Sequence, residues 1–239
     1  MATLYIVATP IGNLEDISLR ALRILSEVDF ILCEDTRVTG VLLKHYNINT
    51  RTISYHQHSS QSKAEEIAGL LAGGKNLALV SDAGTPGISD PGGKLIQYLL
   101  EKLGDDVQIE SVPGPSAVTA ALSISGIPTD KFIFLGFPPH KKGRQTFIKK
   151  IIDSDYPAVV YESKHRIIKF LEELVQAAKS AEQTAEENKK PVNFTSVVVC
   201  RELSKMHETV YRGSPDSIIE KIKADKNDQK GEFVVIIGR

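Results

Sequence analysis

The stretch LVSDAGTPGISDPGG, Leu79–Gly93, joins an apolar run that ends at Ser81 to a helical pattern that begins near Gly93. It contains four glycines, two prolines and two aspartates, together with Thr85 and Ser89. Glycine lets a backbone approach a ligand closely, and proline fixes the path of the chain. A connection that follows a parallel strand is also where open α/β sheets bind ligands. The stretch therefore predicts a buried strand, a binding loop and a helix, in that order.

The segments on either side of residues 79–93 alternate between short apolar strands and helical patterns. Strands are expected at residues 3–9, 30–33, 51–55, 76–81 and 107–112. Helices are expected at residues 14–28, 36–45, 61–74 and 94–103, where apolar residues recur at helical spacing. This alternation is typical of an α/β domain with a mainly parallel sheet that helices cover on both faces.

The pattern changes at PGPSA, Pro113–Ala117, which contains two prolines and a glycine. We therefore expect two α/β domains, at residues 1–113 and 114–239. In the second domain, consecutive strands with fewer helices between them predict a mixed or antiparallel sheet. Residues 179–191 are polar and predict a helix tail and an exposed loop. The expected strands are 131–137, 158–163, 195–200, 208–213 and 231–239, and the expected helices lie near 143–151, 164–178 and 214–223.

The composition is that of an ordinary globular protein, with 239 residues of which 41% are hydrophobic and 25% are charged. No apolar run approaches the ~18 residues of a membrane helix, and the start MATLYIVATPIGN does not predict a secretory signal. Cys33 and Cys200 lie far apart at the ends of apolar runs, which favours buried thiols in a reducing cytoplasm. The formal net charge is −1, so any surface that binds nucleic acid must be local.

Two further loops resemble the first one in composition. TPIGN follows the first expected strand and VPGPSA follows the fifth, so all three loops would lie along one edge of a parallel sheet. The sequence has no G-x-x-x-x-G-K-[ST] motif, and ATPIGNLED fails G-x-G-x-x-G because it contains only Gly12. The loops therefore favour a ligand that backbone groups and small hydroxyls recognise.

Nine blocks occur in one order along the whole chain: VATPIGNLEDISLRAL, CEDTRVTGVLLKHY, YHQHS, LVSDAGTPGISDPG, VPGPSAVTAAL, FLGFPPHKKGR, YESKHR, RELSKMHE and GEFVVII. Together they resemble the tetrapyrrole methylase superfamily, and more narrowly its ribosomal RNA small subunit methyltransferase I branch. The resemblance implies the two α/β domains of a class III S-adenosylmethionine-dependent methyltransferase, with S-adenosylmethionine folded into the cleft between them, and commonly a homodimer. It also implies 2′-O-methylation of a cytidine ribose in 16S rRNA, and hence a cytoplasmic enzyme that acts on the 30S ribosomal subunit.

By motif match, the resemblance assigns cofactor contacts to residues of the three loops and of the YES block. The family usually has proline where Lys164 follows that block. The residues implied as cofactor contacts are Pro10, Asp82, Ala83, Gly84, Ile88, Ser89, Ser116, Ala117 and Glu162.

Methyl transfer to a hydroxyl requires an aligned oxygen and a group that accepts its proton. Asp35 in EDTR follows the second strand, where it could orient or deprotonate the hydroxyl, cap the helix at residues 36–45, or do both. His56 or His58 in YHQH could contact the substrate or act in catalysis, or simply be a polar strand end. No nearby cysteine or second cluster completes a site with this H-x-H spacing, so no metal is expected.

Basic residues follow several expected strand ends, in HKKGRQTFIKK and in RELSK. RNA phosphates need such donors, although a run of charge can also be only a solvated face. We predict RNA contacts for Arg37, Lys142, Arg144, Arg201 and Lys205.

Two other functions are compatible with these patterns. One is methylation of a porphyrinoid precursor by a related enzyme, and the other is a non-catalytic protein that binds RNA or the ribosome. EDTR, YHQH and RELSK resemble the RNA-directed branch, which favours RNA over a porphyrinoid substrate. The intact loops favour an enzyme, because a protein that only binds RNA gains nothing from them.

Overall fold

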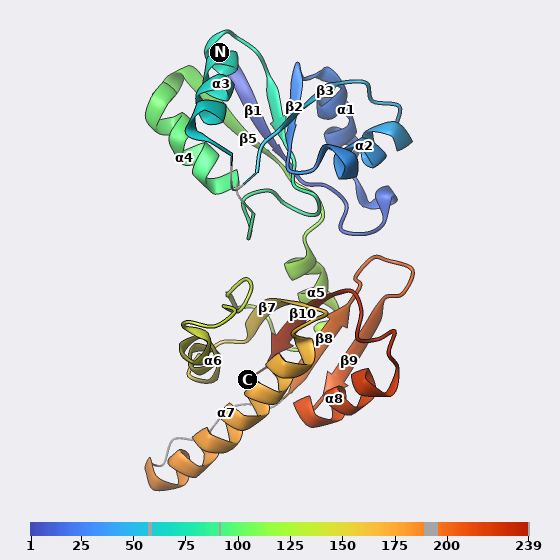
Figure 1. The fold of residues 1–239 in the computed structure, drawn as a ribbon, viewed down its shortest axis with the longest axis vertical. Coiled ribbons are helices and arrows are strands. Elements are labelled where there is room, and N and C mark those ends of the chain that lie inside the picture. Colours follow the sequence, from blue (N-terminus) through green and yellow to red (C-terminus); the bar gives the residue numbers. More distant parts are fainter. Residues whose placement is uncertain (57–58, 91, 189–195, 239) are drawn as a thin grey trace. The chain divides into compact units, whose positions relative to one another are not determined.

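The computed structural model describes residues 1–56, 59–90, 92–188 and 196–238 (Figure 1). The chain divides into two compact units, Met1–Ser116 and Ala117–Arg239, and each contains a five-stranded sheet. The division falls three residues beyond the boundary that we placed after Pro113. None of the helices in the described residues is long and apolar enough to cross a membrane.

The sheet of the first unit is entirely parallel, as the sequence predicts. Its strands pair in the order β3-β2-β4-β1-β5, so strands that are distant in sequence, such as β1 and β4, lie side by side. The segments that follow all five strands therefore leave from one edge, which we call the first carboxyl edge. The strands are β1 (Ala2–Val7), β2 (Phe30–Cys33), β3 (Arg51–Ser54), β4 (Leu77–Leu79) and β5 (Val107–Val112).

Helices cover both faces of this sheet, because neighbouring residues of a strand point to opposite sides. On β2, Leu32 packs in a cluster with residues of α3 (Gln61–Ala72) and α4 (Gly92–Leu103). Ile31 and Cys33 pack in a second cluster with residues of α1 (Leu19–Glu27) and α2 (Thr36–His45). Figure 1 shows the two pairs of helices on opposite sides of the sheet. Two short 3-10 helices, η1 (Leu14–Asp16) and η2 (Gly104–Asp106), complete the unit.

The sheet of the second unit is mixed, which also confirms the prediction. Its order is β6-β7-β10-β8-β9, and only β6 and β7 are parallel neighbours. A single cluster around the buried Phe170 packs three helices against one face. The strands are β6 (Ile133–Phe134), β7 (Ala158–Ser163), β8 (Val197–Arg201), β9 (Thr209–Gly213) and β10 (Glu232–Ile237), and the helices are α5 (Ala117–Ser125), α6 (Arg144–Ile152), α7 (Ile167–Asn188) and α8 (Pro215–Ala224).

β10 is antiparallel to both β7 and β8. The carboxyl ends of β6, β7 and β8 and the amino end of β10 therefore share one edge, which we call the second carboxyl edge. Residues 135–143, 164–166, 202–208 and 225–231 adjoin it.

Three elements differ from the prediction. The expected strand 131–137 is reduced to β6, because Pro138 and Pro139 follow and supply no amide hydrogen to a ladder. The expected helix 14–28 becomes α-helical only at Leu19, after a cap in which the Ser18 hydroxyl accepts from the Ala21 N–H.

The helix α5 was not predicted, since AVTAALSIS is short and follows the PGPSA break directly. The helix α7 runs to Asn188, which confirms the helix tail predicted beyond residue 178, since alanine, glutamate and glutamine favour helix. Residues 189–191 of the predicted exposed loop lie outside the described residues.

Candidate functional site

At the first carboxyl edge, hydrogen bonds join the loops that follow β1, β4 and β5. The Thr9 N–H donates to the Gly84 carbonyl at 2.9 Å, and the Gly84 N–H donates to the Thr9 carbonyl at 3.0 Å. The buried Thr9 hydroxyl also donates to the Ser81 carbonyl at 3.0 Å, and the Thr85 hydroxyl donates to the Pro115 carbonyl at 3.3 Å. The three loops of unusual composition thus form one connected surface.

The loop after β4 depends on backbone conformations that side chains disfavour. Gly84 and Gly87 have φ values of +81° and +84°, and Ser89 has a φ of +65°. A Cβ atom at Gly84 would lie 3.5 Å from Ile11 Cγ2 and 3.8 Å from the Pro115 carbonyl oxygen. Both distances are ordinary van der Waals contacts, so a Cβ would fit against the neighbouring loops. Gly84 is therefore needed chiefly for its left-handed conformation.

The structure brings the predicted cofactor residues of the first unit to this edge. Pro10 and Gly84 are buried, Ser116 is half-buried, and the side chains between and beyond them are exposed. The exposed ones are Asp82, Ala83, Ile88 and Ser89. The other two predicted residues belong to the second unit, where Ala117 begins α5 and Glu162 lies in β7.

Asp35 is the cap of α2, and its carboxylate is occupied. It accepts from the Arg37 backbone N–H at 2.8 Å and pairs with the Arg37 guanidinium at 2.6 Å. The bond from the Arg37 side chain, followed by the backbone bond, lowers the pKa of Asp35 to about 2. The Asp35 N–H donates to the Asp82 carboxylate at 3.2 Å, so the loops after β2 and β4 also touch. An ionised carboxylate held by arginine is better suited to orient a substrate than to accept its proton.

A small pocket lies beside this contact and contains two acids that the sequence analysis did not select. Burial, aided by the negative charge of Asp82 and opposed by a hydrogen bond with Ser81, raises the pKa of Asp90 to about 6. Burial also raises the pKa of Glu34, with added repulsion from Asp90 and Asp82. The residues that line the pocket are Glu34, Tyr55, Leu79, Val80, Ser81, Pro86, Asp90 and Gly92.

A sequence signal for this pair of acids existed. Glu34 and Asp90 belong to loops that follow the adjacent strands β2 and β4, so their proximity follows from the strand order. The sequence alone does not give that order or the burial of either carboxyl group.

His56 is exposed after β3, and its backbone N–H donates to the Ser59 hydroxyl at 2.8 Å. This places it beyond the first carboxyl edge, as predicted, without assigning it a role. His58 lies outside the described residues.

Glu162 and Arg144 form part of a buried ionic cluster in the second unit. The Glu162 side chain, in a residue only 1% exposed, lies 2.9 Å from Arg166 Nε and 3.8 Å from Arg144 Nη1. Arg144, 6% exposed, also bonds Glu173 at 2.7 Å and the Pro139 carbonyl at 3.1 Å. Burial raises the pKa of Glu162, while the Ser163 N–H and the two arginines oppose this shift. The cofactor contact of Glu162 stays a prediction.

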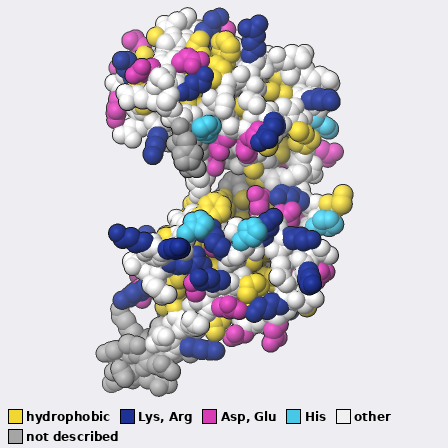
Figure 2. All heavy atoms as spheres, viewed as in Figure 1, with side chains coloured by type: hydrophobic (Ala, Val, Ile, Leu, Met, Phe, Trp, Pro, Cys, Tyr) yellow, Lys and Arg dark blue, Asp and Glu magenta, His cyan; other side chains and the backbone are white. Residues whose placement is uncertain are grey.

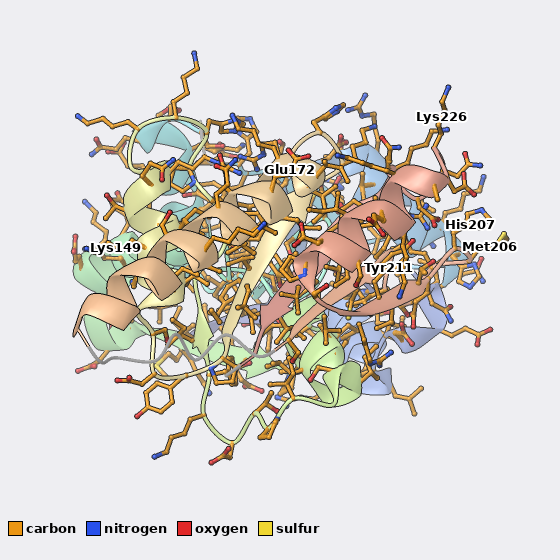
Figure 3. The ribbon with its side chains drawn as sticks, turned by 90° about the horizontal axis from the view of Figure 1, so that it is seen from below. Lys149, Glu172, Met206, His207, Tyr211 and Lys226 are labelled. Carbon is orange, nitrogen blue, oxygen red and sulfur yellow. The ribbon has the colours of Figure 1, made fainter. Side chains whose placement is uncertain are left out.

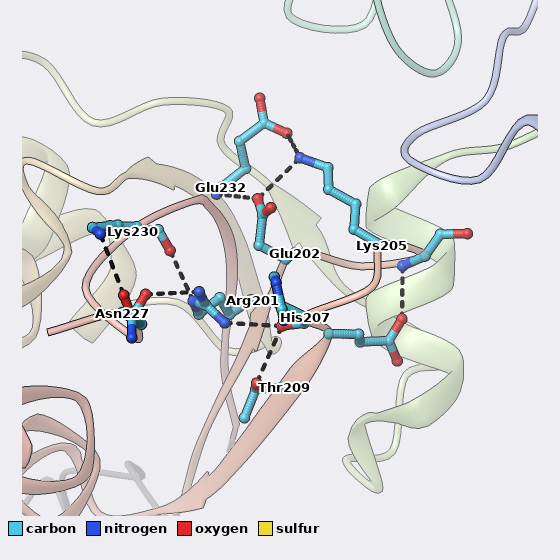
Figure 4. A network of polar contacts seen from close by, with 10 residues as sticks. Arg201, Glu202, Lys205, His207, Thr209, Asn227, Lys230 and Glu232 are labelled. Carbon is cyan, nitrogen blue, oxygen red and sulfur yellow. Dashed lines mark hydrogen bonds and ion pairs between the residues drawn. The ribbon is translucent and has the colours of Figure 1, made fainter. Parts of the chain in front are cut away.

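Arg201 lies at the centre of a network that joins two loops of the second unit (Figure 4). Its guanidinium donates to the carbonyls of His207, Asn227 and Lys230 at 2.8, 2.7 and 2.8 Å, and the residue is 5% exposed. Arg201 directs its donors into the protein, and Arg144 does so except at its buried Nη2, which has no hydrogen-bond partner among the described residues. The RNA contacts of Arg144 and Arg201 stay predictions.

Exposed cations nevertheless surround both arginines at the second carboxyl edge. Lys141 and Lys142 follow β6, Lys164 follows β7, and Lys230 precedes β10. Lys205 follows β8 but is paired with the Glu202 and Glu232 carboxylates at 2.9 and 2.8 Å. Figure 2 shows Lys, Arg and His side chains close together on one face of this unit. The edge offers separate, flexible cations, in contrast to the backbone surface of the first unit.

Comparison with known proteins assigns the chain to a family. A model of the tetrapyrrole (corrin/porphyrin) methylases matches residues 3–218. The chain belongs to the tetrapyrrole methylase family. As a member of this family it is a methyltransferase, and the resemblance drawn from the sequence blocks is confirmed.

Three relatives, each named ribosomal RNA small subunit methyltransferase I, are similar to this methylase over nearly its whole length. The protein from Hydrogenobaculum sp. is 44% identical over 99% of this chain and 95% of its own. That from Escherichia coli O157:H7 is 42% identical over 98% and 77%, and that from Thermotoga maritima is 39% identical over 99% and 98%.

Solved structures of low sequence identity share the fold of this methylase. Cobalt precorrin-4 methyltransferase matches 99% of this chain and 94% of its own with a TM-score of 0.65 and 17% identity. Uroporphyrin-III-C-methyltransferase from Thermus thermophilus matches 100% and 94% with a TM-score of 0.63 and 17% identity. These likenesses support the two-unit α/β architecture.

Proposed function

We propose that this methylase transfers a methyl group from S-adenosylmethionine to the 2′-hydroxyl of a cytidine ribose in 16S rRNA of the small ribosomal subunit. The observation that carries the proposal is the connected surface of three loops at the first carboxyl edge, in a chain 39–44% identical to proteins named ribosomal RNA small subunit methyltransferase I. The same names favour RNA over a porphyrinoid substrate.

The chemistry of the first carboxyl edge fits the cofactor. When bound, S-adenosylmethionine supplies an electrophilic methyl group on a positively charged sulfonium. Carboxylates attract such a cation, and Glu34, Asp35, Asp82 and Asp90 all belong to the loops after β2 and β4. In the segment from Asp82 to Ser89, Asp82, Ala83, Ile88 and Ser89 are exposed, and the main chain around them would contact the cofactor. Pro10 and Ser116 would support it from the neighbouring loops, with Ala117 and Glu162 as further predicted contacts.

Asp35 and Arg37 are suited to hold the substrate. Arg37 is exposed, and its guanidinium pairs with the Asp35 carboxylate at the start of α2. We assign Arg37 to a phosphate of the RNA and Asp35 to the orientation of the ribose hydroxyl. His56 remains a candidate for contact with the same nucleotide.

The second carboxyl edge is suited to the rest of the RNA. Lys142 is exposed beside Lys141, and each could neutralise a backbone phosphate. Lys205 is already paired with two carboxylates, so we assign it a smaller share of RNA binding.

We further propose that the protein acts in the cytoplasm as a homodimer, which is the commonest closed assembly. Sedimentation at micromolar concentration should show twice the 26.2 kDa mass of one chain.

The test is methyl transfer from labelled S-adenosylmethionine to 30S subunits that lack the modification. Nuclease digestion of the 16S rRNA should yield label in 2′-O-methylcytidine. Label on a base, or transfer only to a porphyrinoid precursor, would contradict the proposal.

A further inference from the structure

The loop at residues 202–208, after β8, adopts a strained path at the second carboxyl edge. Glu202 and Ser204 have φ values of +51° and +64°, in the left-handed region that non-glycine residues rarely occupy. Such a conformation is costly and persists only where the surrounding structure imposes it. Strain of this kind concentrates at functional sites, which makes residues 202–208 a candidate functional segment.

Several charged groups impose the conformation (Figure 4). The buried Arg201 guanidinium holds the His207 carbonyl at one end of the loop. Lys205 bridges Glu202 and Glu232, and the Glu208 carboxylate accepts from the Ser204 N–H at 2.6 Å. The Glu202 carboxylate also accepts from the Glu232 N–H at 2.8 Å. The loop is therefore fixed at both ends and in its middle.

The side chain that this rigid loop presents to solvent is apolar. Met206 is 93% exposed, more than any other large hydrophobic side chain in the described residues. The next residue, His207, is also exposed, and Figure 3 shows both at the rim of the protein, directed away from the ribbon. Strained non-glycine residues cluster at functional sites, so the strained loop that presents Met206 and His207 is a candidate surface for contact with a partner.

We propose that Met206 and His207 pack against an unpaired nucleobase of the RNA substrate, with Arg201 as the positioning residue that holds them in place. The inference rests on the proposed function and adds a contact of a different chemical kind to it. Unpaired bases stack on flat side chains, histidine included, and a thioether packs well on aromatic rings. RNA is favoured over a protein partner because the same edge carries Lys141, Lys142 and Lys164.

The test uses the M206A/H207A variant and its binding to 30S subunits over a range of salt concentrations. Stacking of one base contributes enough that affinity should fall by about tenfold, with the salt slope unchanged, because no phosphate contact is lost. Affinity for S-adenosylmethionine and the melting temperature should stay at their wild-type values. Tyr156→Ala, which removes an exposed aromatic side chain just before β7 at the opposite edge, is the matched control and should have no effect.

The role of Arg201 is tested with Arg201→Lys, alone and combined with M206A/H207A. Lysine keeps the charge but cannot hold three carbonyls at once, so the single variant should lose about as much RNA affinity as M206A/H207A. The combined variant should lose little more, since both changes remove the same contact. If Arg201→Lys does not fold, the RNA affinity of M206A/H207A alone tests the proposed contact.

Two outcomes would overturn the inference alone. One is wild-type RNA affinity of M206A/H207A in a protein that still methylates 30S subunits. The other is loss of the homodimer in sedimentation with unchanged RNA affinity per chain, which would assign the loop to a second copy. Absence of RNA binding and methylation in the wild-type protein would instead overturn the proposed function, and this inference with it.

Discussion

The loops at the two carboxyl edges of this methylase are held in place by different kinds of contact. At the first edge, backbone bonds between Thr9 and Gly84 join neighbouring loops, and glycines supply the required conformations. At the second edge, the buried guanidinium groups of Arg144 and Arg201 hold loop carbonyls. The first arrangement leaves a main-chain surface surrounded by carboxylates, and the second leaves lysine and histidine side chains exposed.

This difference matches the ligands that we propose for each edge. A small cationic cofactor is recognised best by a fixed backbone and negative charge, whereas an extended polyanion needs separate cations on a stable base. At the second edge the buried arginines hold loops in place, and we propose that the exposed lysines bind RNA.

The largest effect is expected at Gly84. In Gly84→Val the branched side chain must enter a space where a Cβ already lies 3.5 Å from Ile11, and its left-handed conformation is disfavoured. Calorimetry should show S-adenosylmethionine affinity reduced by more than about 100-fold, since a displaced loop forfeits several backbone contacts. Gly74→Val is the matched control, because Gly74 has nearly the same φ but precedes β4 at the opposite edge. It should lose similar stability and keep cofactor affinity; equal affinity losses in both variants would mean that strain alone is responsible.

A large loss of stability is expected at Arg144. Arg144→Ala removes the arginine that pairs with Glu173 and one of the two arginines beside Glu162, at a cost of about 3 kcal/mol in the free energy of unfolding. Lys142→Ala, two residues away and exposed, should change that free energy by less than about 0.5 kcal/mol. Denaturant titration of both variants measures the two free energies of unfolding and tests this prediction. Equal stability of the two would mean that Arg144 is not a structural anchor.

A smaller effect is expected from Asp90. Its pKa of about 6 lies above the usual range for an aspartate, so the folded state binds more protons between about pH 4 and 6. The free energy of unfolding should therefore decrease as the pH rises through this window. Asp90→Asn should remove this dependence and be more stable than the wild type at pH 8 by about 1 kcal/mol, allowing for partial exposure. Asp105→Asn, before β5 at the opposite edge, is the control. An unchanged pH profile in Asp90→Asn would show that the carboxyl group is well solvated.

The smallest effect is expected from the exposed lysines. Lys141→Ala combined with Lys142→Ala should weaken binding to 30S subunits and lower the salt slope by about two, one for each phosphate contact. Lys149→Ala combined with Lys150→Ala removes the same charge from the last turn of α6 and should leave the slope unchanged. Equal salt slopes for the two double variants would show that Lys141 and Lys142 do not contact RNA phosphates.

The sequence predicts those features that depend on local chemistry. The glycines of residues 79–93, the capping position of Asp35 and the strand alternation all follow from short-range rules. The direction of Arg144 and Arg201 does not, because an arginine after a strand looks the same in sequence whether it points inward or outward. The raised pKa of Asp90 likewise depends on burial and on the adjacency of β2 and β4, which only the folded chain defines.

The division of labour between the edges is tested most directly by two binding measurements on two variants. Calorimetry with S-adenosylmethionine and salt-dependent binding to 30S subunits would be applied to Gly84→Val and to the Lys141→Ala, Lys142→Ala protein. We expect Gly84→Val to lose cofactor binding and keep RNA binding. The double lysine variant should bind RNA more weakly, with a lower salt slope, and keep cofactor binding. Loss of both activities in either variant, with the fold intact, or cofactor binding by Gly84→Val at wild-type affinity, would contradict the assignment of one ligand to each edge.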